Sequence, residues 1–451
     1  MAVPHQVSAG FTEADEKSAN KKLLIRILPF ISLLYMLSYL DRVNIGFAKE
    51  QLEADLGIGA AAYGLGAGIF FVGYVIFEIP SNLILHRVGP RRWLSRIMVT
   101  WGLVAAGMAF IQGPISFYVM RFILGFAEAG LFPGVVMYLT YWYSNKGRST
   151  AIGLSVYWGL AISFILGGPL SELLLSMDGT ADFQGWQWMF GVQGGLTIIV
   201  GVITWFYLTD RPSDATWLTA AERESVEAKV AEEDQTRLHV PVRRALSDRK
   251  VLYLGAIFFC INLSLYGLTF WLPSIVGNIE GLTGTQRGLL VGMPWVFGLV
   301  SVFLVTRVAD RTGKHAKAAA ISLATLALGL ALSTTVGPIL GMVFISVAVC
   351  GLLGALPTFW NLPTNYLSGA AAAAGVALIN TIGSLSGFTA PYLFGLIEGA
   401  TGSIKLGLYT LSTMALVGSI LLLRYRKASV TPTEAGAVPV TAQPTATHAG
   451  A

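Results

Sequence analysis

The chain has 451 residues, of which 54% are hydrophobic and only 12% are charged. This charged share is about half of what an average soluble domain carries, so the composition excludes a water-facing surface over most of the protein. The formal charge of +5 comes from basic residues scattered among short segments, which argues against a nucleic-acid partner, and the two cysteines lie in apolar stretches, which argues against a disulfide framework.

Apolar blocks recur along the chain from residue 23 to residue 424. Each is about 20 residues long, which is the length that an α-helix needs to cross the hydrocarbon layer. We therefore expect an all-α membrane protein with twelve transmembrane helices in two six-helix halves. The predicted spans are 24–47, 63–85, 93–112, 115–140, 149–176 and 186–208, then 251–278, 286–306, 317–336, 338–362, 372–397 and 405–424.

Polar segments divide the chain into five parts. Residues 1–22 are predicted to be an N-terminal tail without a cleavable signal, so that the first apolar stretch remains as helix one of a bundle over 23–209. A linker is predicted at 210–250, where Thr219 to Leu238 opens with the Thr-x-x-Glu pattern of a capped surface helix. The second bundle covers 251–427, and the Ala-, Thr- and Pro-containing tail at 428–451 is expected to be disordered.

Lys and Arg are distributed unequally between alternate loops. Loops that carry more positive charge face the cytoplasm, so the asymmetry predicts an inner-membrane protein with both termini inside. The basic loops contain Arg87, Arg91, Arg92, Lys146, Arg148, Arg243, Arg244, Arg249, Lys250, Arg311, Lys314 and Lys317.

A short basic turn occurs twice, once after the second span of each half. The first copy runs from His86 to Arg91 and the second from Asp310 to His315, each with a central glycine. Such a repeat indicates two related halves, although two basic turns can also arise by chance in a protein with many spans.

With this repeat the chain resembles the major facilitator superfamily, whose members have two pseudo-symmetric six-helix halves and an Asp-Arg-x-Gly-Arg type of turn after helices two and eight. The second copy fits the pattern well, whereas His86 stands where the first copy usually has Asp. The resemblance implies a role in conformational change for these turns. The residues concerned are Arg87, Gly89, Asp310, Arg311, Gly313 and Lys314.

Further motifs are similar to the anion:cation symporter branch of that superfamily, and the second half is most similar to bacterial carriers of tartrate, phthalate and other hydroxy or aromatic carboxylates. The resemblance implies proton-coupled uptake of a small organic carboxylate by alternating access. The motifs are Tyr39-Leu-Asp41-Arg42-Val-Asn44, Pro80-Ser-Asn82, Arg121 to Glu128, Tyr266 to Pro273, Phe359-Trp360-Asn361-Leu-Pro363, and Gly375 through Asn380 to Pro391.

Four charged residues lie well inside apolar spans, where a charge costs several kcal/mol unless it is paired or hydrated. Arg121 and Glu128 are two helical turns apart and share one face, with Gly125 between them. Arg42 shares a face of helix one with Tyr35, Tyr39 and Gly46, whereas Asp41 points about 100° away. Helix one can therefore present Arg42 to a cavity and Asp41 to a neighbouring helix.

The resemblance implies that helices one, four, seven and ten line the central cavity. Arg42 would then bind the substrate carboxylate, Asp41 and Glu128 would carry protons, and Arg121 would be the switchable partner of Asp41. The two carboxylates balance the two guanidinium groups, so a bound anion would favour protonation of a carboxylate. Polar residues expected to assist in substrate binding are Tyr39, Tyr74, Tyr266, Asn361 and Asn380. Packing would explain Tyr74 equally well, and interhelical hydrogen bonding would explain Asn361 and Asn380 equally well.

Two alternatives remain open from the sequence. The four charges could form inert ion pairs that lock helices one and four together, and a proton-coupled exporter of drugs or metabolites could share the fold. An enzyme is not expected, because all five histidines lie outside the span cores, and no ATP-binding loop, cofactor motif or metal-ligand cluster is present. The expected partners are a small organic anion, protons and the lipid bilayer, and we expect a monomer.

Overall fold

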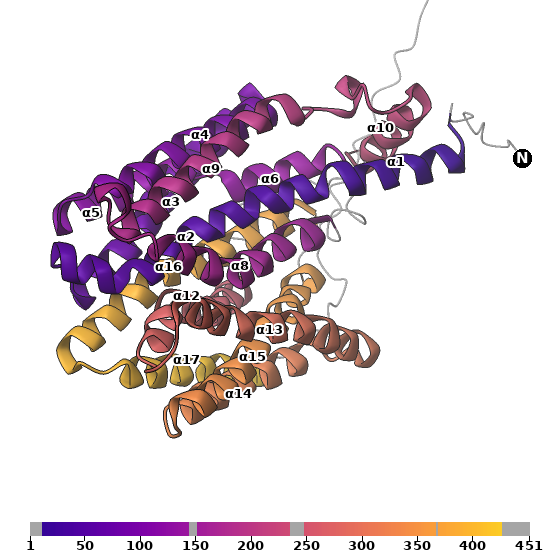
Figure 1. Cartoon of the computed structure of the whole chain (residues 1–451). Coiled ribbons are helices and arrows are strands. Elements are labelled where there is room, and N and C mark those ends of the chain that lie inside the picture. Colours follow the sequence, from indigo (N-terminus) through magenta and orange to yellow (C-terminus); the bar gives the residue numbers. More distant parts are fainter. Residues whose placement is uncertain (1–10, 144–150, 235–247, 367–368, 426–451) are drawn as a thin grey trace, which may run out of the picture.

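The computed structural model describes residues 11–143, 151–234, 248–366 and 369–425, and these residues fold into a helical bundle (Figure 1). The main helices of the first part are α1 (Glu13–Arg26), α2 (Leu28–Leu56), α3 (Ala60–Val88), α4 (Pro90–Gly107), α5 (Pro114–Glu128), α6 (Leu131–Thr140), α8 (Trp158–Leu175), α9 (Gly185–Tyr207) and α10 (Ala220–Asp234). Those of the second part are α12 (Arg249–Gly277), α13 (Gly284–Thr312), α14 (His315–Ser333), α15 (Pro338–Tyr366), α16 (Gly369–Thr401) and α17 (Ile404–Arg424).

The helices have the lengths and surfaces of membrane spans. Within the described residues, eleven helical segments are long and apolar enough to cross a bilayer, and the 33-residue helix α16 supplies the twelfth. Large apolar side chains such as Phe110, Ile115 and Phe206 are more than 70% exposed, as expected where lipid is the solvent. Figure 1 shows most helices of the two halves on opposite sides of the molecule, with α2 to α9 in indigo and magenta and α12 to α17 in brown, orange and yellow, and α16 overlaps the first half in this view.

The fourth predicted span is broken in the middle. Helix α5 ends at Glu128 and α6 begins at Leu131, and between them Gly130 adopts a φ of +92°, which glycine tolerates because it has no Cβ atom. The apolar composition of 115–140 gave no signal of this break. As a result, Glu128 lies at the very end of a helix instead of within one.

The two repeated turns have the same backbone feature and different neighbours. Gly89 and Gly313 both have positive φ, of +94° and +65°, and each separates two helices. In the first copy, Asp210 at the end of α9 accepts a hydrogen bond from the Arg91 amide at 2.8 Å, and its other oxygen lies 3.7 Å from Arg91 Nε. The first turn has His86 instead of an Asp, and the carboxylate of Asp210 from elsewhere in the chain lies beside this turn.

The two halves meet closely at one end, which we call the Lys49 end and define by the last turns of α2, α8, α12 and α16 and the first turns of α3 and α13. A Cβ atom at Gly64 would lie 2.4 Å from the Pro391 carbonyl oxygen, and one at Gly168 would lie 2.2 Å from that of Gly288. Backbones this close leave no room for a solute between them. The Lys49 end is therefore closed in this conformation.

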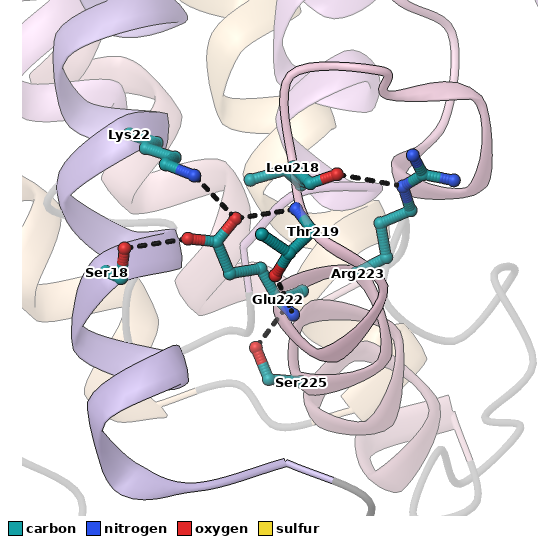
Figure 2. A network of polar contacts seen from close by, with 7 residues as sticks. All are labelled: Ser18, Lys22, Leu218, Thr219, Glu222, Arg223 and Ser225. Carbon is teal, nitrogen blue, oxygen red and sulfur yellow. Dashed lines mark hydrogen bonds and ion pairs between the residues drawn. The ribbon is translucent and has the colours of Figure 1, made fainter.

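Residues 13–22, predicted as part of a tail, instead belong to helix α1, which packs against α10 (Figure 2). Thr12 and Asp15 make a capping box that starts α1. The predicted capping box of the linker is also present, because the Glu222 amide donates to Thr219 Oγ1 and the Thr219 amide donates to Glu222. The linker helix is thus attached to the chain's first helix.

Glu222 joins the two helices. Ser18 and Lys22 of α1 each donate to its carboxylate at 2.7 Å, and its side chain is only 3% exposed (Figure 2). Burial alone would raise the pKa of Glu222, but the hydrogen bonds from Lys22, Ser18 and Thr219 together with the Lys22 charge outweigh burial and lower the pKa to about 2.

We expect the contact between α1 and α10 to depend on acidity. Because the folded pKa lies below the ordinary value, the stabilisation is fully present above pH 4.5 and is lost as pH falls through about 2. Hydrogen-exchange protection of the α1 and α10 amides should fall over that range, and Glu222→Gln should show reduced protection already at pH 6. Glu227→Gln, an exposed carboxylate on the same helix, should behave like the unmodified chain.

Candidate functional site

An arginine and a glutamate from two helices of the first half form a buried ion pair. Arg42 of α2 donates from Nε at 2.9 Å and from Nη2 at 2.5 Å to the same oxygen of Glu128 on α5. Ser38, one turn earlier on α2, donates to that oxygen at 2.7 Å. The other carboxylate oxygen of Glu128 is buried without a hydrogen-bond partner. One oxygen is therefore saturated, and the second is free to take a proton or a hydrogen bond.

Aromatic rings surround the Arg42 guanidinium on its remaining sides. Its Cζ atom lies 5.0 Å from the ring centre of Tyr39, 5.3 Å from that of Phe70 and 5.2 Å from that of Tyr74. Rings at these distances stabilise a cation through their faces. The side chain of Arg42 is 10% exposed and that of Glu128 is fully buried, so the pair is nearly closed to solvent in this conformation.

Asp41 belongs to a second polar cluster on a different face of α2. Its carboxylate accepts from Thr197 Oγ1 of α9 at 3.3 Å and, at 3.5 Å, from Asn44 Nδ2. Asn44 also donates to Gln193 of α9 at 2.8 Å. The spacing along α2 predicts this separation of Asp41 from Arg42. The hydrogen-bond partners on α9 were not foreseen, although Gln193 and Thr197 are polar residues one turn apart inside an apolar span.

Arg121 does not have the partner that was predicted for it in this conformation. Its Nε atom donates to the carbonyl oxygen of Gly66 at 3.2 Å and Nη2 donates to that of Ala67 at 3.5 Å, both on α3, and the guanidinium lies 4.9 Å from the Phe70 ring centre. These carbonyls are within reach because α3 and α5 pack closely at Gly125, where a Cβ atom would lie only 1.9 Å from the Phe70 carbonyl oxygen. Carbonyl groups of α3, which were not among the predicted partners of Arg121, therefore hold its guanidinium.

Tyr266 of α12 connects the second half with the Arg42 cluster, which we define as Arg42, Glu128, Ser38, Tyr39, Phe70 and Tyr74. Its buried ring lies 4.7 Å from that of Phe71, and its hydroxyl is among the groups close enough to Arg42 to affect the guanidinium electrostatically. The other two predicted residues of this half are placed differently. Asn361 donates to the Pro357 carbonyl of its own helix at 3.0 Å, and none of the contacts described for the chain links Asn361 or Asn380 to the cluster.

The predicted motif residues of the second half lie at the surface. Asp310, Arg311, Gly313 and Lys314 are exposed, and Asp310 is 3.8 Å from His315. Arg87 in the first copy is exposed as well. These turns lie at the opposite end of α3 and α13 from the Lys49 end, and none of the contacts described for the chain links them to Arg42 or Glu128.

Comparison with known proteins gives matches over most of the chain. The family model described as Major Facilitator Superfamily matches residues 31–391. A protein of Agrobacterium vitis that is named as a tartrate transporter is 41% identical and covers 92% of each chain. The quinolone resistance transporter of Acinetobacter baumannii is 40% identical over 90% of this chain and 94% of its own.

A solved structure supports the same fold. The xylose transporter XylE from E. coli, in a partially occluded inward open conformation, matches 90% of this chain and all of its own with a TM-score of 0.69 and 13% identity. At that identity the match concerns the arrangement of the helices only. The predicted fold, twelve membrane helices in two halves, is confirmed.

Proposed function

Because the chain belongs to the Major Facilitator Superfamily of multi-pass membrane transporters, we propose that it takes up a small organic carboxylate together with protons by alternating access. The single observation that carries this proposal is the buried pair of Arg42 and Glu128, in which a guanidinium fork is held by a carboxylate that has a free oxygen. The relative named for tartrate transport supports a hydroxy, sugar or aromatic acid as cargo.

In this proposal the substrate carboxylate replaces Glu128 on Arg42. A guanidinium binds a carboxylate with two parallel hydrogen bonds and stays charged at any physiological pH, so Arg42 is suited to this exchange. Glu128, once released, is a carboxylate in a dry, apolar site, and it takes up a proton because its charged form has lost its partner. Anion and proton thereby favour each other's binding, which is the coupling that symport requires.

Asp41 is proposed as a second proton carrier and Arg121 as a residue that changes partner during the cycle. In the present conformation Arg121 binds backbone carbonyls of α3, and Asp41 binds Thr197 and Asn44. A movement of α3 relative to α5 would release Arg121 toward Asp41. Tyr39, Tyr74 and Tyr266 surround Arg42 and would contact the substrate, whereas Asn361 and Asn380 could join only after α15 and α16 move.

The proposed setting is the inner membrane of a bacterial-type cell, with a monomeric chain and both termini in the cytoplasm. This orientation follows from the basic turns, which lie at the end opposite Lys49. The Lys49 end would then face outward, and the present conformation would be one that is closed to the outside.

Export of drugs is the competing function, and the quinolone resistance transporter among the relatives favours it. Uptake in proteoliposomes separates the two. With a lower pH outside the vesicles than inside, we expect accumulation of at least one organic acid from a panel of L-tartrate, sugar acids, phthalate and 4-hydroxybenzoate. A protonophore should abolish this accumulation. Proton-driven movement of norfloxacin without accumulation of any acid would instead establish the exporter.

A further inference from the structure

A second buried cation lies two turns beyond Arg42 on the same face of α2. Lys49 is seven residues after Arg42, a spacing that returns to the same side of a helix about 10 Å further along. Its side chain is only 6% exposed. Lys49 lies two residues beyond the predicted span 24–47 and was not among the predicted site residues.

The partner of Lys49 comes from the other half of the molecule. Its Nζ atom lies 2.6 Å from each carboxylate oxygen of Glu398 on α16, and Trp271 of α12 donates to Glu398 at 2.7 Å. The ammonium also lies 5.7 Å from the Tyr63 ring centre and 5.5 Å from that of Trp271. Helices from both halves therefore meet around one buried charge, at the closed end of the molecule.

The two cations on this face of α2 are held in the same way, each by one protein carboxylate. The difference is that the partner of Arg42 is in the same half, whereas Glu398 must move away from Lys49 whenever the halves separate at this end. Trp271 belongs to the same half as Glu398 and moves with it, so Lys49 is then an ammonium beside the Tyr63 ring without its present carboxylate partner. Such a site attracts a carboxylate, because a partly buried charge is costly when it is unpaired.

We propose that Lys49 is a second anion-binding position, at which a substrate carboxylate and Glu398 bind alternately. A substrate that arrives at the open Lys49 end binds there first and then passes along the same face of α2 to Arg42. When the substrate has left Lys49, Glu398 pairs with Lys49 again and closes this end behind the substrate. The proposal deepens the proposed function and rests on an anionic substrate.

Equilibrium binding of the panel acids to the purified chain distinguishes an anion-binding Lys49 from an ion pair that only holds the two halves together. Lys49→Gln and Glu398→Gln break the same ion pair, so a purely structural ion pair predicts the same change in affinity for both variants. An anion-binding Lys49 predicts opposite changes. Glu398→Gln removes the competitor and should bind the panel acids more tightly, whereas Lys49→Gln and the double variant should bind them about tenfold more weakly than Glu398→Gln. Lys405→Gln removes an exposed lysine at the same end and should change nothing.

A distance measurement adds a readout that does not depend on transport. Spin labels at exposed positions 54 and 401, in a chain with Cys260→Ser and Cys350→Ser, report on separation of the halves at the Lys49 end. L-tartrate should increase the separated population in this chain and also with Arg42→Ala, but not with Lys49→Gln. Threitol, its uncharged analogue, should have no effect in any of them.

The charge swap Lys49→Glu with Glu398→Lys controls for damage to the fold. It should restore the closed distance, because the ion pair is re-formed with its charges exchanged. Equal affinities for the two single variants, or a tartrate response that survives Lys49→Gln, would overturn the anion-binding position. Failure of the proposed function is distinguishable, since it is read from absence of acid uptake by the unmodified chain.

Discussion

Replacing Arg42 with alanine should weaken binding of the transported carboxylate by about 30-fold or more. Loss of one member of a buried, hydrogen-bonded charge pair costs about 2–5 kcal/mol, and each 1.4 kcal/mol corresponds to a tenfold change in Kd. Arg42→Lys keeps the charge but loses the planar fork that donates from two nitrogen atoms, so it should recover only part of the affinity. The measurement is the Kd of the purified protein for the acid that binds most tightly among those of the uptake panel.

A double variant controls for damage to the fold. Arg42→Ala alone leaves Glu128 buried with an unpaired charge, which could disturb helix α5. Arg42→Ala with Glu128→Gln removes that charge as well. If Arg42 binds the substrate, the double variant remains as weak as the single one, and recovery to the affinity of the unmodified chain would show that Arg42 serves only to neutralise Glu128.

Replacing Glu128 with glutamine should remove proton-driven accumulation and leave substrate exchange intact. Gln keeps an oxygen that can accept from Arg42 and Ser38, so the helices should pack as before, but it cannot carry a proton. For each coupled proton, a difference of one pH unit supplies about 1.4 kcal/mol, or roughly tenfold accumulation. In Glu128→Gln that contribution should disappear, while binding of the acid should be no weaker because a competing charge has been removed.

The assay compares net uptake under a pH gradient with exchange of labelled for unlabelled acid at equal pH. Glu53→Gln, an exposed carboxylate near the end of the same helix as Arg42, should accumulate the acid like the unmodified chain. Accumulation that persists in Glu128→Gln at the original ratio would remove Glu128 from the proton pathway. Asp41→Asn would then be the next variant to test, since Asp41 is a second buried carboxylate among the described residues of the membrane helices in this half.

Hydropathy predicted most of the membrane helices within a few residues, because a bilayer requires about 20 apolar residues for each crossing and forces the backbone to satisfy its own hydrogen bonds. It did not predict the break after Glu128, which depends on a single glycine with positive φ. It also missed helix α1, whose polar sequence is stabilised by contacts with α10 instead of by lipid. Local composition is a reliable guide to a helix that is surrounded by lipid. It is less reliable for a helix, such as α1, that is stabilised by contacts with another part of the chain.

The sequence by itself determined that the protein lies in a membrane, that four charges are buried there, and that Arg42 and Asp41 point to different sides of α2, because these follow from composition and helical period alone. Only the tertiary structure decided the partners. It joined Arg42 to Glu128, placed Arg121 on carbonyls of α3, and brought Lys49 to Glu398 across 349 residues of sequence. Hydrogen bonds act over about 3 Å, so their partners depend on how closely helices approach, and that distance is fixed by contacts such as the one at Gly125.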